Sequence, residues 1–219
     1  AGLITPWNTP FMLESWKLGP ALATGNSVVL KPAEFTPLSA SLWAGIFEEA
    51  GLPKGVFNLV NGLGEDAGDA LVKHPDVPLI SFTGESRTGQ IIFGNSAPFL
   101  KGLSMELGGK SPAVVFDDAD LDKAVDGATA AKFRNIGQAC TAANRFIVQS
   151  SVAEEFAHRV TERVAAFKTG RGTEEGVTIG PLIDDRAVAK ASELVTDAVE
   201  RGATVRTGGH AIDRPGTFY

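Results

Sequence analysis

The stretch LISFTGESRTGQIIF, residues 79 to 93, decides the fold class because it contains one complete structural unit. Residues 79 to 82 have the short apolar character of a buried strand, and Thr83-Gly84 follows them as a tight turn. A helix is predicted from Ser86 to Phe93. A strand that passes through a glycine turn into a helix is the repeating unit of α/β proteins with a largely parallel sheet.

Earlier parts of the chain repeat this unit. A strand is predicted over Ser27 to Leu30, followed by a helix over Pro37 to Glu49. The next unit has a strand over Val56 to Val60, a turn from Gly62 to Gly64 and a helix over Asp66 to Lys73. The first hundred residues are therefore predicted to form an α/β domain.

A second domain is predicted to begin where Gly108-Gly109 interrupts this pattern, which gives domains over residues 1–107 and 108–219. The last strand of the first domain is predicted over 103–107. In the second domain, strands are predicted over 113–116 and 145–149, and helices over 121–133, 152–167 and 184–201.

Composition excludes several classes of function. The 219 residues carry a net charge of -6 with the charges interspersed, which argues against binding to nucleic acid. No apolar run approaches the roughly 20 residues needed to cross a bilayer, so no membrane partner and a cytoplasmic location are expected. One cysteine rules out an internal disulfide, and three widely spaced histidines give no metal site.

The single cysteine, Cys140, is the first candidate for chemistry. It lies in Asn135-Ile-Gly-Gln-Ala-Cys-Thr141, a small and polar setting that would let a substrate approach the sulfur closely. A lone cysteine is more often a buried small hydrophobe, so both interpretations stay open at this point.

Polar residues at predicted strand ends are the other candidates. Glu106 ends an apolar strand just before Gly108-Gly109, and Lys31 and Glu34 follow another buried strand. Carboxylates at the carboxyl ends of parallel strands face the crevice where ligands bind, although solvated charges are the simpler interpretation. The side-chain amide of Asn8 is able to donate to an oxyanion or to serve only in a turn.

Five short motifs, taken together, resemble the aldehyde dehydrogenase superfamily over the whole length from Ile4 to Tyr219. They are Pro6-Trp7-Asn8, Lys31-Pro-Ala-Glu34, Phe82-Thr83-Gly84, Glu106-Leu-Gly-Gly-Lys110 and Gly137-Gln-Ala-Cys140. The resemblance implies a Rossmann-like cofactor domain joined to an α/β catalytic domain. Since members are more than twice as long, both domains are expected to be incomplete, and the isolated piece is expected to have poor stability and little activity.

The resemblance also implies a mechanism. The Cys140 thiolate attacks the aldehyde to give a thiohemiacetal, and Asn8 and the Cys140 N–H hold its oxyanion. After hydride transfer, Glu106 activates the water that releases the carboxylate from the thioester. NAD is expected rather than NADP, because Glu34 would repel a 2′-phosphate. The residues implied in cofactor binding are Ile4, Thr5, Pro6, Trp7, Lys31, Glu34, Gly64, Gly68, Phe82, Thr83, Gly84, Thr88, Leu107 and Gly108.

The substrate implied is an acid semialdehyde. The segment around Phe133-Arg134-Asn135 is similar to that of succinate-semialdehyde dehydrogenases, in which the arginine matching Arg134 contacts the substrate carboxylate. Those enzymes have a second arginine where this chain has Trp16, and segments 5–16 and 83–89 look more like dehydrogenases of hydroxymuconic semialdehydes. Glu85 stands where many members have serine, and an acidic side chain that faced the pyrophosphate would disfavour phosphate contacts there.

Two other functions remain as alternatives. A CoA-acylating relative would finish by thiolysis, for which the water-activating Glu106 is not needed. A noncatalytic fragment that keeps the fold is the alternative outside enzymes. The parent chain is expected to form a homo-oligomer.

Overall fold

The computed structural model describes all 219 residues and divides them into two compact units, Ala1–Gly108 and Gly109–Tyr219. Both units are α/β, which confirms the predicted fold class. None of the helices combines the length and the hydrophobicity that a membrane span requires. No three histidine, cysteine or carboxylate side chains gather into a group that could hold a metal ion.

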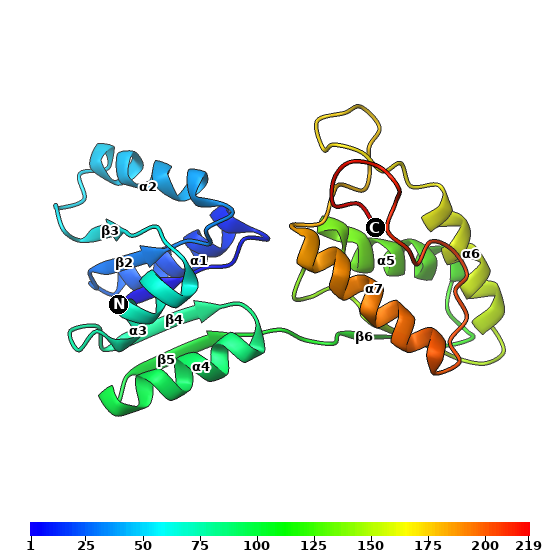
Figure 1. The fold of residues 1–219 in the computed structure, drawn as a ribbon, viewed down its shortest axis with the longest axis horizontal. Helices are drawn as coiled ribbons and strands as arrows, with labels where there is room; N and C mark the ends of the chain where they lie inside the picture. Colours follow the sequence, from blue (N-terminus) through cyan, green and yellow to red (C-terminus); the bar gives the residue numbers. More distant parts are fainter. The chain divides into compact units, whose positions relative to one another are not determined.

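Unit 1 is built on a five-stranded sheet in which every neighbouring pair is parallel, in the order β3-β2-β1-β4-β5 (Figure 1). After β3 the chain returns to the opposite side of β1, so the direction of winding changes between β1 and β4. The strands are β1 (Gly2–Ile4), β2 (Val28–Lys31), β3 (Phe57–Leu59), β4 (Leu79–Thr83) and β5 (Gly102–Glu106).

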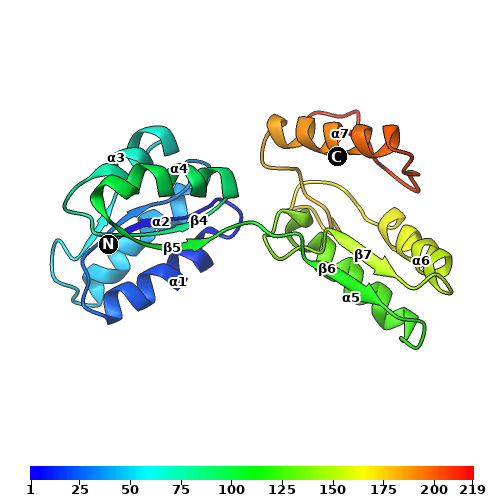
Figure 2. The ribbon, with the colours of Figure 1, turned by 90° about the horizontal axis from the view of Figure 1, so that it is seen from below.

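Helices cover both faces of this sheet. Figure 2 shows α1 and α2 on one face and α3 and α4 on the other. Side chains alternate accordingly: Leu3 packs toward α1 and α2, whereas Ile4 packs toward α3 and α4. The helical elements are α1 (Pro10–Ala23), α2 (Pro37–Glu49), the π-turn η1 (Gly64–Gly68), α3 (Asp69–Lys73), α4 (Ser86–Ser96) and the 3-10 turn η2 (Ala97–Phe99).

Helix α1 and strand β1 are the elements that the sequence pattern did not predict. The buried positions of α1 include Glu14 and Lys17 beside apolar Leu18, and Pro20 lies inside the helix. Two charges on the buried face and an internal proline hide the apolar period of a helix. The predicted helix over 66–73 is also partly wrong, because its first turn is the π-turn η1.

A partly buried hydrogen bond joins α1 to α2. Trp43 Nε1 donates to Glu14 Oε2 at 2.9 Å, and the Trp43 ring stacks on Phe11 with centroids 4.6 Å apart. Glu14 is fully buried, and its other carboxyl oxygen has no partner. Burial raises the pKa of Glu14, while the bond from Trp43 acts in the opposite direction.

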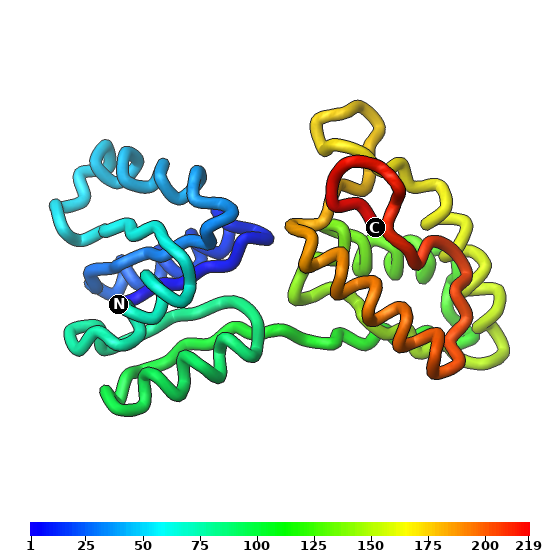
Figure 3. The backbone as a smooth tube through the Cα atoms, in the orientation of Figure 1, coloured from blue at the N-terminus to red at the C-terminus, as the bar shows by residue number.

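Unit 2 contains a parallel pair of strands, and Val115, Val125, Ala128 and Phe156 form its core. The C-terminal segment, red in Figure 3, folds back so that the Leu182 N–H donates to the Thr217 carbonyl. The elements are β6 (Pro112–Val115), α5 (Leu121–Phe133), the turn η3 (Arg134–Gly137), β7 (Arg145–Val148), α6 (Ala153–Ala165) and α7 (Asp185–Glu200).

We predict that Glu14→Gln stabilises the whole protein at neutral pH. The raised pKa means that the folded state binds a proton more tightly than the unfolded state, so stability falls as pH rises above about 4.5, the unfolded value. Glutamine keeps the acceptor for Trp43 without the charge. The expected rise in Tm at pH 7 is about 2–4 °C, and it should shrink toward pH 4.5.

Calorimetry of the wild type and the variant at both pH values checks this prediction. Glu49→Gln, at an exposed position on α2, is the matched control for loss of a carboxylate. Equal shifts for the two variants, or a gain for Glu14→Gln that is independent of pH, would contradict it.

Candidate active site

A pocket of about 450 Å³ opens in unit 1 where the winding of the sheet reverses. Ile4 at the end of β1 and Phe82 in β4 line its floor, while η1 and α4 contribute Gly64, Gly68 and Thr88. All five residues were predicted to contact the cofactor. A crevice at the carboxyl ends of parallel strands, at a switch in winding, is where dinucleotides bind in this type of sheet.

The glycines around this pocket have two different roles. A Cβ added to Gly64 or Gly68 would meet no atom within 4 Å, so both leave open space for a ligand. A Cβ on Gly84 would lie 2.5 Å from Cζ of Phe82, so Gly84 is needed for packing. Beside it, Glu85 precedes α4 and its side chain makes no capping bond.

Three polar side chains at the pocket form a hydrogen-bonded group that no sequence signal singles out. Asp69 accepts from Lys73 Nζ and from Asn95 Nδ2, both at 2.7 Å. The hydrogen bond from Lys73 is the main cause of the lowered pKa of Asp69. These three residues line the pocket and were missed because each has the ordinary appearance of a solvated helix residue.

Lys31 and Glu34 are not among the residues that line this pocket. Lys31 Nζ lies 3.4 Å from Glu34 Oε2, with the lysine side chain 4% exposed and the glutamate side chain 40% exposed. Lys31 is therefore a buried strand-end charge that holds a more exposed carboxylate, rather than one of two solvated charges. Lys31 ends β2, the strand beside β1, at the same edge of the sheet as Ile4.

The segment between β1 and α1 holds other predicted residues. The Thr5 N–H donates to the Lys31 carbonyl at 3.2 Å, so it continues the pairing of β1 with β2 beyond the strand. Thr5 is buried, whereas Pro6, Trp7 and Asn8 are partly exposed in the bend that follows.

Glu106 is the last residue of β5, where it pairs in register with Thr83, and its side chain is exposed. The Gly84 N–H donates to the Glu106 carbonyl at 3.0 Å. Leu107 follows it and packs into the core beneath α4, with its side chain against Gly89.

Lys17 is a buried charge near Glu106 that sequence reasoning missed. Its ammonium donates to Ser81 Oγ at 2.8 Å. Burial lowers the pKa of Lys17 to about 8, and the negative charge of Glu106 acts in the opposite direction. The attraction between the charges of Lys17 and Glu106 therefore links α1 to the end of β5.

Unit 2 presents Cys140 exposed at the end of a strained turn. Asn135 and Ile136 have φ values of 51° and 53°, and Gly137 follows at 79°. The left-handed region is costly for residues other than glycine, by about 1–3 kcal/mol each, and most unfavourable for a β-branched one such as Ile136. Such strain persists only where the surrounding structure imposes it.

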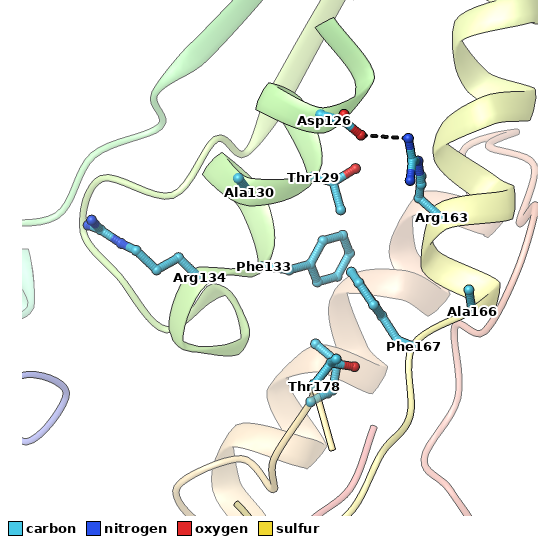
Figure 4. A pocket seen from close by; sticks show the side chains of 10 residues that line it. Asp126, Thr129, Ala130, Phe133, Arg134, Arg163, Ala166, Phe167 and Thr178 are labelled. Atoms are coloured by element: carbon cyan, nitrogen blue, oxygen red, sulfur yellow. Dashed lines mark ion pairs between the residues drawn. The ribbon is translucent and has the colours of Figure 1, made fainter. Parts of the chain in front are cut away.

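Arg134 lies on the same turn and reaches toward the cysteine. Its Nη2 donates to Thr141 Oγ1 at 3.2 Å, next to Cys140. Figure 4 shows the guanidinium pointing away from Phe133 and Phe167, which stack edge to face at 5.1 Å on the wall of a hollow of about 600 Å³. Although Arg134 is among the residues that line this hollow, its guanidinium donates to the cysteine loop.

These features define a two-part α/β protein with a pocket at a switch in the winding of one unit's sheet and an exposed thiol in the other unit. The chain belongs to the aldehyde dehydrogenase family, whose model matches residues 1–219.

Named relatives share close to half of the residues. The succinate-semialdehyde dehydrogenase [NADP(+)] of Escherichia coli is 50% identical over 99% of this chain and 45% of its own length. A glutarate-semialdehyde dehydrogenase of Pseudomonas aeruginosa is 48% identical, again over 99% of this chain and 45% of its own. The chain thus spans a little under half the length of these curated relatives.

Two solved structures superpose closely on this chain, which again covers less than half of each of them. An Escherichia coli NADP-dependent enzyme superposes with a TM-score of 0.96 at 48% identity, over 100% of this chain and 46% of its own. Betaine aldehyde dehydrogenase of Staphylococcus aureus, in complex with NAD+, superposes with a TM-score of 0.96 at 40% identity, over 100% and 44%.

We predict that Gly68→Leu blocks the unit 1 pocket without harming the fold. The backbone at Gly68 is right-handed helical, so leucine is tolerated there, and its side chain would enter the open space. The Kd for NADH in the whole protein should rise at least about tenfold, with little change in Tm. Fluorescence titration and a thermal melt measure the two effects.

Gly84→Ala is the contrasting variant, because its added Cβ would strike Phe82 and lower Tm. An unchanged NADH affinity in Gly68→Leu would show that the dinucleotide binds elsewhere.

Proposed function

We propose that the whole protein oxidises an aldehyde to a carboxylate with a nicotinamide dinucleotide, using Cys140 as nucleophile. The observation that carries this proposal is the exposed Cys140 at the end of a strained turn, in a chain of the aldehyde dehydrogenase family. A core cysteine would be buried among apolar side chains, and Cys140 is not.

The residues of this chain have the following proposed roles. The Cys140 thiolate forms a carbon–sulfur bond with the aldehyde carbon, and the resulting oxyanion accepts hydrogen bonds from the Asn8 amide and the Cys140 N–H. In other enzymes that stabilise an oxyanion in this way, one such donor contributes roughly 3 kcal/mol to transition-state stabilisation. A dinucleotide held in the unit 1 pocket would supply the hydride acceptor. Loss of the hydride from the carbon of the thiohemiacetal, with re-formation of the carbonyl, would leave a thioester on Cys140.

Glu106 completes the proposed cycle. Its carboxylate takes a proton from water as the oxygen attacks the thioester carbon, and the carbon–sulfur bond breaks to release the carboxylate product. Its place at the carboxyl end of β5, at the same edge of the sheet as Ile4 and Phe82, supports this role.

The cofactor proposed is NAD in preference to NADP. Glu34 is an exposed carboxylate held by Lys31 at the end of β2. A carboxylate there accepts hydrogen bonds from ribose hydroxyls and repels a 2′-phosphate. The relatives include both an enzyme named for NADP(+) and a structure with NAD+, so this preference rests on Glu34.

The substrate proposed is an acid semialdehyde. Arg134 places a guanidinium beside Thr141, one residue from the nucleophile. Relatives with 47–50% identity are named for succinate semialdehyde, glutarate semialdehyde and 3-sulfolactaldehyde, each of which carries an anionic group. Trp16 is 65% exposed and contributes no second positive charge.

NADH formation by the whole protein tests the reaction. Succinic semialdehyde, glutaric semialdehyde and neutral aldehydes should be assayed with NAD and with NADP, with and without CoA. We expect CoA-independent activity, higher kcat/KM with NAD, and loss of turnover in Cys140→Ala. Glu106→Gln should retain a burst of NADH and lose steady-state turnover about 100-fold or more, because only hydrolysis needs the base.

Activity that depends on CoA would favour the acylating alternative. Turnover that persists in Cys140→Ala would rule out the proposed nucleophile.

Arg134→Met tests the substrate class. The variant should raise KM for succinic semialdehyde about 10- to 100-fold, the range of a hydrogen bond to a charged group, and leave KM for butanal almost unchanged. Thr141→Val is the control, since it removes the bond to Arg134 and keeps the charge. Equal losses with both aldehydes would contradict a role in binding the carboxylate.

A further inference from the structure

We propose that Gln138 is a positioning residue for Cys140, because its side chain fastens the cysteine turn to the backbone at Ile183. This inference rests on the proposed nucleophilic role of Cys140. The Ile183 N–H donates to Gln138 Oε1 at 3.0 Å, in a partly buried setting, across 45 residues of sequence.

The turn before Cys140 needs an external support. Its backbone is left-handed at Asn135, Ile136 and Gly137. Within the turn, the Gln138 N–H donates to the Asn135 carbonyl, and Asn135 Nδ2 donates to the Gln138 carbonyl. These bonds are local and would move together if the turn relaxed, whereas the bond from Ile183 ties it to another part of unit 2.

The backbone at Ile183 is a fixed point of attachment, because hydrogen bonds fix the residues on both sides of it. The Leu182 N–H donates to the Thr217 carbonyl at 2.8 Å, and Thr217 Oγ1 donates back to Leu182 O. On the other side, Asp184 caps α7 by accepting from the Ala187 N–H at 2.8 Å. Gln138 is thereby fixed to the start of a helix.

The residues that follow Cys140 are fixed by burial and by hydrogen bonds. Ala142 and Ala143 are buried, the Ala143 N–H donates to the Ala131 carbonyl, and Asn144 Nδ2 donates to the Gly109 carbonyl. With this downstream side fixed, the position of the thiol depends on the upstream side, which Gln138 holds. Loss of the Gln138 bond would let the strained residues relax and displace the sulfur.

Gln138→Met in the whole protein is the test, because methionine matches the length of glutamine and lacks the acceptor oxygen. The hydrogen exchange of the Ile183 amide should accelerate. The kcat for succinic semialdehyde should fall about 10- to 100-fold, the range for a reacting group displaced by about 1 Å. The KM for NAD should change little, and the pH profile of Cys140 alkylation by iodoacetamide should shift.

Two further variants separate positioning from general loosening. Gln138→Glu keeps an acceptor oxygen for Ile183 and should recover most of the turnover at the plateau of its pH profile. Gln149→Met is the matched control, because Gln149 Oε1 also accepts from a backbone N–H in unit 2, that of Asp117. It should keep wild-type kcat.

Wild-type kcat and alkylation in Gln138→Met, beside an inactive Cys140→Ala, would overturn this inference and leave the proposed function standing. Equal loss of kcat in Gln149→Met would overturn it as well. Activity in Cys140→Ala would remove the proposed function itself and this inference with it.

Discussion

The three-residue strand β1 is the constraint on which unit 1 depends. It lies between β2 and β4, and all three run parallel, so their carboxyl ends meet at one edge. Gly2 permits this packing, because a Cβ there would lie 2.8 Å from Cδ1 of Ile80. The reversal of winding on either side of β1 opens the pocket above Ile4. Residues that are far apart in sequence thus reach one site because three strands end together.

Much of this arrangement follows from local sequence signals. Helices α2 and α5 begin and end at the predicted residues, since Pro37 suits a first helical turn and Asp120 caps α5 by accepting from the Lys123 N–H. The pocket residues Gly64 and Gly68 were found through the family resemblance, because their spacing does not match the usual dinucleotide fingerprint. The open space beside these two glycines could not be predicted from the sequence pattern alone.

The features that escaped prediction are those in which tertiary contacts override local preference. Asn135 and Ile136 are left-handed although neither is glycine, and no sequence rule would place a β-branched residue there. The hydrogen bond from Ile183 to Gln138 spans 45 residues, so only the folded unit reveals it. Exposure of Cys140 was likewise undecided by sequence, where a buried cysteine was the more common outcome.

Helix α1 has two charged residues, Glu14 and Lys17, on its buried face. Burying a charge is unfavourable unless it is paired or hydrogen-bonded, so Glu14 and Lys17 lower the stability that apolar residues would provide there. Both have specific partners: Trp43 on α2 for Glu14, and Ser81 on β4 for Lys17. Burial lowers the pKa of Lys17, and the negative charge of Glu106 at the end of β5 opposes that shift, so the lysine and this carboxylate interact electrostatically. Lys17, one of the residues that hid this helix from sequence analysis, therefore connects it to the proposed site, whereas Glu14 connects it to α2.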